Sequence, residues 1–472
     1  MKTNQINRRQ LLKWAGIAGS GAVLAACAPP AAPQAPSAAS SGNKPVEPTA
    51  APQTSSSSGV EIEWLNAWSS KNTVEPLKAM IPVFEKETGI KVNFKNPGGA
   101  PEGGNYREIL LSRIAGGDAP DVGYADTTPA EWAAQGAVIP IDDQMKVAKI
   151  AKPEAYYPAA LKSCQWSGKT YGLPSSAGAG SMFINTKLLA DKKISIKRED
   201  MPKTWDDWKT LSAQFVEKDD KGGYKQIGSA PFVGNSWLYP VWSASFGGKI
   251  YDPASNTYTI DSKENQNWLG YWVTWLDEQY GGNLEALRTS GNWEGTYPNS
   301  GFNLGRSAIS VEGSWATTDA DIPFGFEVAR FPVGPGATKS YTGFWPNWFM
   351  LPKGAKHPAE AFKFIEYLTT TGWVTWYKAI MDTPAWKDFP KDVLTEKLIK
   401  NVGREKGLDY HTFFGDYLSD AVDMWNSPIE QFARDTMSSA VEEILSKKKT
   451  VQDGLAAAQK TCTEKLAQTV KS

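Results

Sequence analysis

Three short stretches of the chain have patterns that predict β-strands. In residues 60–64 and 90–94, large apolar side chains alternate with charged or amide side chains. A repeat of two places the apolar side chains on one face of a strand. Residues 120–124 follow the Gly116-Gly117 pair and form a third candidate strand.

Two stretches between these strands have the spacing of helices. Apolar residues in 74–84 recur at intervals of three and four, and residues 106–114 carry a similar stripe. Asn72 or Thr73 is available as the N-cap of the first helix, and Gly89 is placed to end it. The order strand, helix, strand, helix, strand predicts a parallel sheet in an α/β protein.

The predicted sheet indicates where a binding site would form. In parallel α/β sheets, ligands bind beyond the carboxyl ends of the strands. Trp68 follows the first strand and Asp126 follows the third. The loops that hold these two residues are therefore the first candidates for a site.

Further helices are predicted along the rest of the chain. Thr204-Trp205-Asp206-Asp207 has the pattern of a capped helix start. Trp268, Trp272 and Trp275 recur at helical spacing and are expected in the core. The predicted helical ranges are 205–215, 265–278, 361–368 and 455–466.

The N-terminal segment has the plan of a signal peptide. Arg8-Arg9 precedes the apolar run 14–26, which is short and rich in glycine. The run ends at Leu24-Ala25-Ala26-Cys27, which resembles a bacterial lipobox. We expect cleavage after residue 26 and lipidation of Cys27, giving a membrane anchor. The alternatives are an uncleaved membrane helix for the segment, and Sec instead of twin-arginine export for the route.

The segment that follows lacks the residues of a folded domain. Residues 28–59 contain 22 Ala, Pro or Ser among 32, and Val46 is their single large apolar side chain. Such a composition cannot repay the entropy of ordering. We expect residues 27–59 to be a disordered tether between the lipid and the folded body.

Length, charge and composition narrow the function classes. A chain of 472 residues exceeds one compact core, so two lobes are expected. A net charge of -1 provides no excess of positive charge for binding nucleic acid, so nucleic acid is not expected as a partner. His357 and His411 are the chain's two histidines, which disfavours histidine-based metal sites and nucleophilic catalysis. The chain contains twenty tryptophans, an unusually large number that needs a structural or functional explanation.

Several motifs, taken in order, resemble the extracellular solute-binding proteins of ABC importers, in the family that includes the maltose-binding protein. GDAPDVGYAD followed by EWAAQGAVIPID is the most diagnostic block. GRSAISVEGSW is similar to the family's small-residue strand that ends in glycine and tryptophan. The matching segments are 84–94, 117–126, 131–142, 171–174, 183–189, 202–208, 305–315, 357–368 and 450–459.

The resemblance implies a fold, a role and a set of partners. The fold is α/β, a two-lobed type II periplasmic-binding-protein fold with a ligand cleft between hinged lobes. The protein is expected to be a monomeric binding component, not an enzyme, that delivers solute to ABC permease subunits from the outer side of the cell membrane. The expected lobes are 60–175 with 340–383, and 176–339 with 384–472.

Aromatic faces with carboxylate or amide groups are the natural recognition set for a sugar. Trp315 and Glu312 belong to the block whose tryptophan stacks on sugar in the maltose-binding protein, and Asp126 lies where the family often has a sugar-binding acid. The expected solute is therefore a carbohydrate. The predicted binding residues are Trp68, Tyr124, Asp126, Trp237, Tyr239, Glu312, Trp315, Trp345, Asn347 and Trp425.

The solute itself is left open by the sequence. The stretch 175–180 contains no acid where the maltose-binding protein has a glutamate, so its small residues either leave room for a bulkier solute or pack the hinge. The alternative within the same role is a non-sugar solute, such as a glycerophosphodiester or a polyamine. A phosphate ligand would call for Arg or Lys in the cleft loops, and Arg306 and Arg330 leave that alternative open. A remote alternative is a glycoside hydrolase that uses Asp126 and Glu312.

The remaining chemistry is sparse. Cys164 and Cys462 lie far apart in sequence, and separate buried thiols are expected rather than a disulfide. The chain has no Cys-x-x-Cys, Walker A or Rossmann glycine pattern. We therefore expect no metal and no cofactor.

Overall fold

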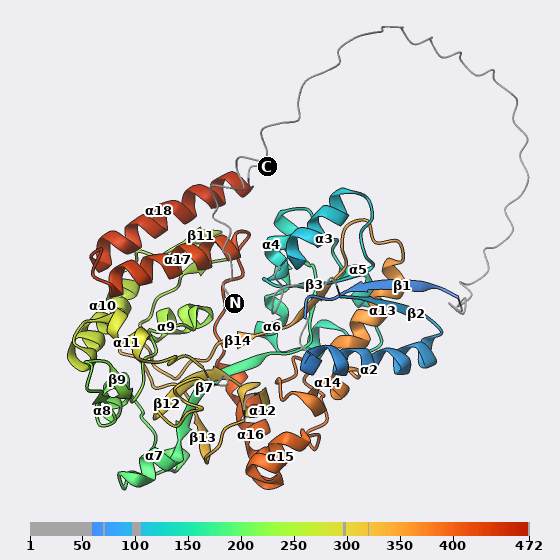
Figure 1. Cartoon of the computed structure of the whole chain (residues 1–472). Helices are drawn as coiled ribbons and strands as arrows, with labels where there is room; N and C mark the ends of the chain where they lie inside the picture. Colours follow the sequence, from blue (N-terminus) through green and yellow to red (C-terminus); the bar gives the residue numbers. More distant parts are fainter. Residues whose placement is uncertain (1–58, 69–70, 97–104, 296–298, 320, 471–472) are drawn as a thin grey trace, which may run out of the picture. The chain divides into compact units, whose positions relative to one another are not determined.

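The structure of the chain is a computed structural model, and its described residues belong to one compact unit. The predicted signal peptide 1–26 and Cys27 lie outside the described part, as does the predicted tether 27–59 apart from Gly59. The described residues are 59–68, 71–96, 105–295, 299–319 and 321–470 (Figure 1).

The first sheet contains the three strands predicted near the N-terminus. Its first three strands are parallel, as predicted, and Ile62 and Trp64 are fully buried on its inner face. β15 joins β3 antiparallel, and β6 joins β15 antiparallel and so runs in the direction of the first three strands, which makes the sheet mixed. Its order is β2 (Lys91–Lys95), β1 (Glu61–Leu65), β3 (Val122–Ala125), β15 (Trp348–Met350) and β6 (Leu173–Pro174).

Helix α2 (Lys71–Thr88) connects β1 to β2 and buries its predicted apolar stripe, with Leu77 fully buried. The helix ends at Gly89, whose φ of 74° is readily adopted by glycine. The predicted N-caps Asn72 and Thr73 are wrong, because the helix begins at Lys71 and both residues lie in its first turn.

Helices from two distant parts of the chain pack on the first sheet. Phe364 of α13 meets Trp64 edge-on, with ring centroids 5.1 Å apart, and α14 lies alongside α2 (Figure 1). The remaining elements here are α3 (Tyr106–Ala115), α4 (Pro129–Ala134), α5 (Asp142–Val147), η1 (Pro153–Ala155), α6 (Pro158–Lys162), β4 (Gln165–Trp166), β5 (Lys169–Thr170), α13 (Pro358–Thr369) and α14 (Trp373–Ala379).

The second sheet is built around one long buried strand. β7 (Gly178–Asn185) is buried at every residue and pairs antiparallel with β12 (Ile309–Gly313) and β13 (Phe326–Ala329). β14 (Phe344–Trp345) pairs with the first residues of β7. The start of β7 is therefore held between the ends of β12 and β14.

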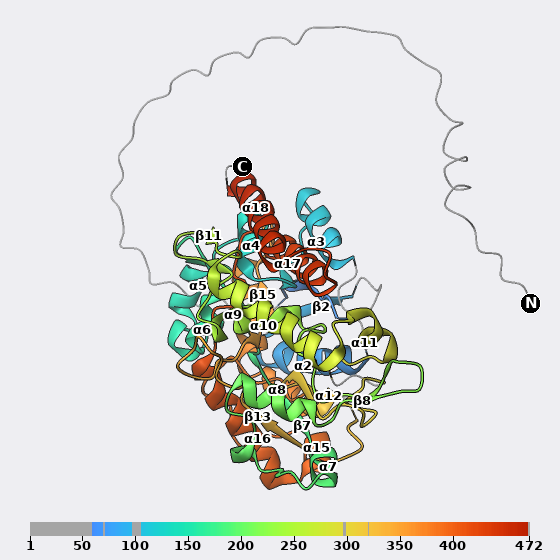
Figure 2. The same ribbon diagram turned by 90° about the vertical axis from the view of Figure 1, so that its left-hand side faces the viewer.

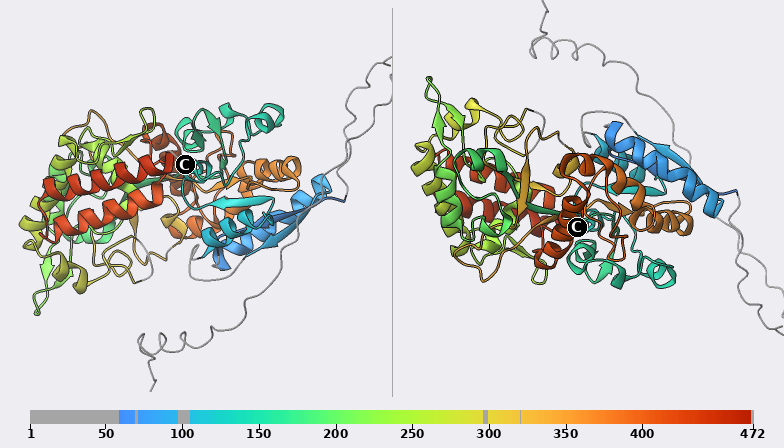
Figure 3. Two further views of the ribbon diagram at one scale, coloured as in Figure 1. Left: turned by 90° about the horizontal axis from the view of Figure 1, so that it is seen from above. Right: turned by 90° about the horizontal axis from the view of Figure 1, so that it is seen from below.

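Helices rich in tryptophan surround the second sheet. Trp268, Trp272 and Trp275 are fully buried, which confirms their predicted place in the core. The predicted cap is also confirmed, because Thr204 and Asp207 form a reciprocal capping box. α9 lies beside α10 (Figure 2), and α17 and α18 run side by side (Figure 3). The remaining elements are α7 (Thr186–Asp191), η2 (Arg198–Asp200), α8 (Trp205–Ala213), β8 (Glu217–Lys218), β9 (Tyr224–Gln226), η3 (Ser236–Leu238), α9 (Tyr239–Ser245), β10 (Tyr251–Asp252), β11 (Thr257–Tyr258), α10 (Lys263–Tyr280), α11 (Leu284–Ser290), α12 (Ala316–Asp319), α15 (Glu396–Val402), α16 (Arg404–Tyr417), η4 (Leu418–Asp420), α17 (Glu430–Leu445) and α18 (Val451–Val470).

The chain passes between the two sheets in short segments that touch one another. One segment joins β6 to β7, a second joins β14 to β15, and a third follows α14. Ser176 in the first pairs with Pro384 in the third, and its hydroxyl accepts a hydrogen bond from the backbone N–H of Asn347 in the second, at 3.1 Å. The predicted lobe boundaries stay a prediction.

The two cysteines of the described residues, Cys164 and Cys462, are buried free thiols, as predicted. Burial raises the pKa of the Cys462 thiol to about 11. Both side chains therefore behave as small apolar residues of the core.

Candidate binding site

Three of the predicted binding residues come together as a tryptophan cluster, which consists of Trp237, Trp315 and Trp345. The ring of Trp237 lies 5.5 Å from that of Trp315 and 6.3 Å from that of Trp345. All three side chains are half-buried, unlike the core tryptophans. The cluster gathers η3, the turn after β12 and the end of β14 at one place.

Two glycines make room for Trp315. A Cβ atom added at Gly178 would lie 2.4 Å from the Trp315 ring, and one added at Gly313 would lie 2.3 Å from it. Gly180 is also close to the cluster, since its added Cβ would lie 3.2 Å from Trp237. Gly178 and Gly180, two of the small residues of 175–180, thus fit against the protein's own tryptophans, which favours the hinge-packing interpretation of this stretch.

A second aromatic group consists of Trp68, Tyr124 and Trp376. Trp68 is stacked on Trp376 at 4.9 Å and is tilted against Tyr124 at 4.8 Å. Trp68 and Tyr124 lie at the carboxyl ends of β1 and β3, where the parallel sheet predicted a site. Trp376 was missed, because its position in a helical pattern is typical of a core residue.

A buried polar junction links this aromatic group to the crossing segments. Tyr124 Oη donates to Asn347 Oδ1 at 3.2 Å, and Asn347 Nδ2 donates to both Ser176 Oγ and Asp382 Oδ2 at 2.9 Å. Burial raises the pKa of Asp382 to about 7, against the opposing effect of hydrogen bonds from Ser176 and Asn347. Asp382 Oδ1 has no hydrogen-bond partner among the described residues. Asp382 was missed, because acids are common in loops and its local pattern carries no signal.

Asp126 lies at the end of β3 in a bidentate pair with an arginine. Arg107 Nε and Nη2 donate to its two carboxylate oxygens at 3.2 and 2.7 Å. The guanidinium also lies 4.7 Å from the centre of the Trp132 ring and 3.4 Å from Glu131 Oε1. Asp126 keeps about a third of its side chain exposed (32%), so one edge of the pair faces solvent.

Two buried glutamates connect α4 to the start of α17. The backbone N–H of Thr128 donates to Glu430 Oε2 at 2.8 Å, and the backbone N–H of Gln431 donates to Glu131 Oε2 at 3.2 Å. Each glutamate thus accepts a hydrogen bond from the other's helix or its flank. We call Glu131, Glu430 and the arginines beside them, Arg107 and Arg434, the carboxylate junction.

The carboxylate junction reaches the tryptophan cluster through Arg434. Its guanidinium lies 4.7 Å from the centre of the Trp345 ring, a cation–π distance, and 3.8 Å from Glu430 Oε1. Burial is the largest cause that raises the pKa of Glu131, to about 7, and also raises the pKa of Glu430. Arg434 was missed, since a helical arginine is usually a surface residue.

The other predicted binding residues lie in the core. Tyr239 begins α9 and packs edge-on against Trp268 at 5.5 Å. Trp425 is almost fully buried, with its ring 6.5 Å from that of Tyr239. Glu312 is buried in β12, where its carboxylate accepts from the backbone N–H of Gly313 at 3.0 Å.

Arg306 and Arg330, the two arginines that left a phosphate ligand open in the sequence, have other partners. Arg306 donates to the backbone carbonyls of Lys225 and Tyr224 at 2.7 Å. Arg330 forms an ion pair with Asp420 at 2.6 Å. Both guanidinium groups therefore serve local structure.

Searches for metal and membrane elements cover the described residues only. Within this part of the chain, no group of three or more His, Cys, Asp or Glu side chains could hold a metal ion. Among the helices of the same residues, none has both the length and the apolar character needed to cross a bilayer.

Comparisons with known proteins place these features in a family. The family model described as bacterial extracellular solute-binding protein matches residues 68–375. An ABC transporter extracellular-binding protein of Pyrococcus horikoshii is 26% identical over 78% of this chain and 84% of its own length. A maltooligosaccharide ABC transporter solute-binding lipoprotein of Streptococcus pneumoniae is 23% identical over 68% of this chain and 71% of its own.

A solved structure supports the same assignment at the level of the fold. The sugar-binding protein MalE from Xanthomonas citri aligns with a TM-score of 0.68 at 19% identity, over 87% of this chain and 98% of that one. The two sheets, the crossing segments between them and the match over most of the folded body agree. The chain belongs to the bacterial extracellular solute-binding protein family and has its two-lobed type II periplasmic-binding-protein fold.

Proposed function

We propose that this protein is the binding component of an ABC importer and that it captures a saccharide and delivers it to the membrane permease. The observation that carries the proposal is the half-buried tryptophan cluster beside the crossing segments. The names of the Streptococcus pneumoniae and Xanthomonas citri proteins, a maltooligosaccharide binder and a sugar-binding protein, support it.

The chemistry of the cluster suits a sugar ring. The C–H face of a pyranose packs on an indole ring, and its hydroxyls need donors and acceptors at the edge. Trp315 would supply the stacking face. Asn347 and Asp382 lie at the junction that borders Gly178, and the Asp382 oxygen without a partner is an acceptor for a sugar hydroxyl.

Capture would involve closure of two lobes about the crossing segments. We assign residues 60–175 with 340–383 to one lobe and 176–339 with 384–472 to the other. The carboxylate junction joins α4 of the first to α17 of the second. It would form as the lobes close and would mark the closed form for the permease.

The N-terminal segment would hold this body at the membrane. Arg8-Arg9 and the lipobox-like Leu24-Ala25-Ala26-Cys27 suit export and lipidation of Cys27, and one relative is named a lipoprotein. Each buried methylene of the acyl chains adds about 0.8 kcal/mol to anchoring. The protein would act as a monomer on the outer side of the cell membrane, with residues 27–59 as its tether.

A thermal-shift screen tests the proposed solute class. The protein is tested with mono- and oligosaccharides, glycerol phosphates, polyamines and amino acids. A ligand at a hundredfold over its Kd stabilises by about 2.7 kcal/mol, which moves the midpoint by a few degrees. We expect a shift with one saccharide class. A shift with a phosphate or polyamine alone would overturn the sugar assignment but keep the transport role.

Hydrolysis is a separate outcome of the same screen. Products are followed by chromatography after incubation with each saccharide that binds. We expect the saccharide to be recovered intact. Turnover that is lost in Glu312→Gln would instead identify a glycoside hydrolase.

A further inference from the structure

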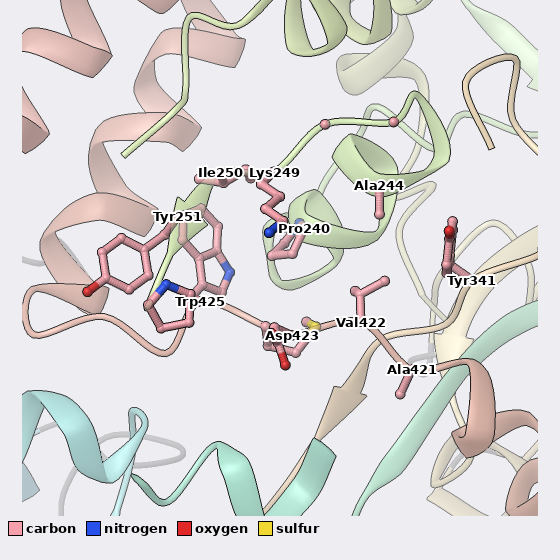
Figure 4. A pocket seen from close by; sticks show the side chains of 14 residues that line it. Pro240, Ala244, Lys249, Ile250, Tyr251, Tyr341, Ala421, Val422, Asp423 and Trp425 are labelled. Atoms are coloured by element: carbon pink, nitrogen blue, oxygen red, sulfur yellow. The ribbon is translucent and has the colours of Figure 1, made fainter. Parts of the chain in front are cut away.

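The charged side chains of the pocket in Figure 4 do not select a ligand. The pocket has a volume of about 430 Å³ and lies between the end of α9, the loop that follows it and the segment 421–425. Its charged side chains are Lys249, which is exposed, and Asp423, which accepts a hydrogen bond from Lys162 Nζ at 2.6 Å. A charged group with unused hydrogen-bonding capacity lies instead on α17, beside the tryptophan cluster.

Arg434 is the one described arginine that donates no hydrogen bond to a described residue. Its Nε is buried without an acceptor, and Glu430 Oε1 lies 3.8 Å from its Nη1, which is beyond hydrogen-bond distance. The other seven described arginines each donate at least one hydrogen bond: Arg107, Arg113, Arg198, Arg288, Arg306, Arg330 and Arg404.

Arg107 provides a direct comparison, because it belongs to the same carboxylate junction. The side chains of Arg107 and Arg434 are equally exposed, at 17%. Arg107 nevertheless donates from Nε and Nη2 to Asp126 and from Nη2 to Thr127. A largely buried guanidinium with unused donors is unfavourable unless solvent or a solute supplies acceptors. Nε of Arg434 is shielded, so Nη1 and Nη2 are the groups that a solute can reach.

Trp345 holds this guanidinium at the tryptophan cluster. The central carbon of the guanidinium lies 4.7 Å from the centre of the Trp345 ring, so one face of that ring is covered by the arginine. The rings of Trp345, Trp237 and Trp315 follow one another at 6.3 and 5.5 Å. A solute that lies along the cluster can therefore meet the stacking face of Trp315 and the donors of Arg434.

We propose that Arg434 is a solute-binding residue and that its Nη1 and Nη2 groups donate to two adjacent oxygen atoms of the solute. This inference rests on the proposed saccharide function and names the group that selects one edge of the sugar. A guanidinium presents its N–H donors as a planar fork, which matches two adjacent oxygens. Neighbouring hydroxyls of a neutral sugar or the carboxylate of a uronic acid supply such a pair. Because Glu430 lies beside the guanidinium and balances its charge, neutral hydroxyls are favoured.

Calorimetry on the full-length protein tests the proposal with maltotriose, mannotriose, cellotriose and trigalacturonate. We expect at least one of the three neutral probes to bind. Arg434→Lys keeps the charge but loses the fork, and should weaken that binding about ten- to a hundredfold. Arg404→Lys on α16, where Nη2 donates to the carbonyl of Asp392, is the matched control and should leave Kd unchanged. Binding of trigalacturonate alone, with the same loss in Arg434→Lys, would support the role of Arg434 and identify a carboxylate as the oxygen pair.

Monodeoxy analogues of the neutral probe that binds distinguish contact with the solute from a structural role. In the wild-type protein, removal of a hydroxyl that Arg434 contacts should weaken binding about tenfold. In Arg434→Lys, the same removal should change Kd by less than about twofold, because the contact is already lost. Equal losses in the two proteins for every analogue would overturn the proposal.

A second variant guards against misfolding, which is followed by the thermal midpoint. Arg434→Met combined with Glu430→Gln removes both charges of the pair, so no buried carboxylate is left without its partner. We expect the same loss of affinity as in Arg434→Lys. Unchanged affinity in both variants, with loss in Trp315→Ala, would overturn the role of Arg434 and leave the proposed function intact. No binding of any of the four probes to the wild-type protein would overturn both.

Discussion

At the scale of single residues, the position of Trp315 depends on two glycines as well as on the neighbouring ring of Trp237. Gly178 and Gly313 lie on neighbouring strands, and each allows the ring to approach the backbone. The glycines thereby hold Trp315 in a half-buried position. Less of its solvent-exposed surface is left to be covered when it stacks on a solute. The same crowding makes the site sensitive to the addition of one methyl group.

Gly178→Ala should displace Trp315. The new Cβ would lie 2.4 Å from the indole and 2.8 Å from Asp382 Oδ1, so the ring, the carboxylate or the strand must shift. We expect the free energy of unfolding to fall by about 1–3 kcal/mol and solute affinity to fall with it. Chemical denaturation and calorimetry measure the two effects.

Gly270→Ala is the matched control for this substitution. Gly270 lies within α10, and an added Cβ there meets nothing within 4 Å. Because alanine is the better helix former, stability should rise by up to about 1 kcal/mol. Equal behaviour of the two variants would show that the close approach at Gly178 has no consequence.

At the scale of elements, the sequence predicted local structure well and long-range neighbours poorly. The strands β1, β2 and β3 and the helices between them follow from apolar spacing, because that spacing decides which face of each element is buried. The antiparallel addition of β15 was not predicted, since its partner β3 lies more than 200 residues away. Trp315 was predicted as a binding residue through the family resemblance of its block, and Trp345 through its aromatic stretch.

The missed site residues share a physical cause. Trp376, Asp382 and Arg434 lie in segments whose local pattern is ordinary, and they reach the site only because distant elements meet there. The pattern within one segment does not show which distant segments it will contact. Tyr239 and Trp425 show the converse, because both were predicted to bind solute and both side chains are buried.

The junction between α4 and α17 should make stability depend on pH. Burial raises the pKa of Glu131 to about 7, so the folded state binds its proton more tightly than the unfolded chain does. The contribution of Glu131 to stability is therefore greatest below its unfolded pKa and is lost as pH rises toward 7. Arg107 and Glu430 surround this carboxyl and act on it in opposite directions.

We expect Glu131→Gln to flatten this dependence. Between about pH 5 and pH 7.5, the difference in unfolding free energy between variant and wild type should change by up to about 3 kcal/mol, in favour of the variant at the higher pH. Urea denaturation at each pH measures it. Glu464→Gln on the exposed face of α18 is the control, and an identical profile for both variants would contradict the account.

At the scale of the whole molecule, Trp315 is connected to the crossing segments. The backbone N–H of Ser314, beside it, donates to the carbonyl of Ala179 at 3.0 Å. The Ser314 hydroxyl accepts a hydrogen bond from Thr383 Oγ1 at 2.9 Å. A solute that holds Trp315 therefore acts next to the start of β7 and next to the segment that follows α14, one of those about which we propose the lobes turn. This arrangement gives solute binding a direct route to closure.

Closure itself should be visible in solution. We expect small-angle X-ray scattering to give a smaller radius of gyration when the bound saccharide is saturating than in its absence. Trp315→Ala at the same saccharide concentration should retain the larger value. An unchanged radius in the saturated wild-type protein would show that capture proceeds without lobe movement.

The central claim is that the tryptophan cluster holds a saccharide, and calorimetric affinity tests it most directly. The saccharide identified by the thermal screen is titrated into the wild-type protein, Trp315→Ala and Trp166→Ala, the last removing a half-buried tryptophan of the β4–β5 hairpin. Loss of a stacking face costs about 1–3 kcal/mol, or roughly five- to 150-fold in Kd. We predict this loss in Trp315→Ala and an unchanged Kd in Trp166→Ala. Wild-type affinity in Trp315→Ala would contradict the claim.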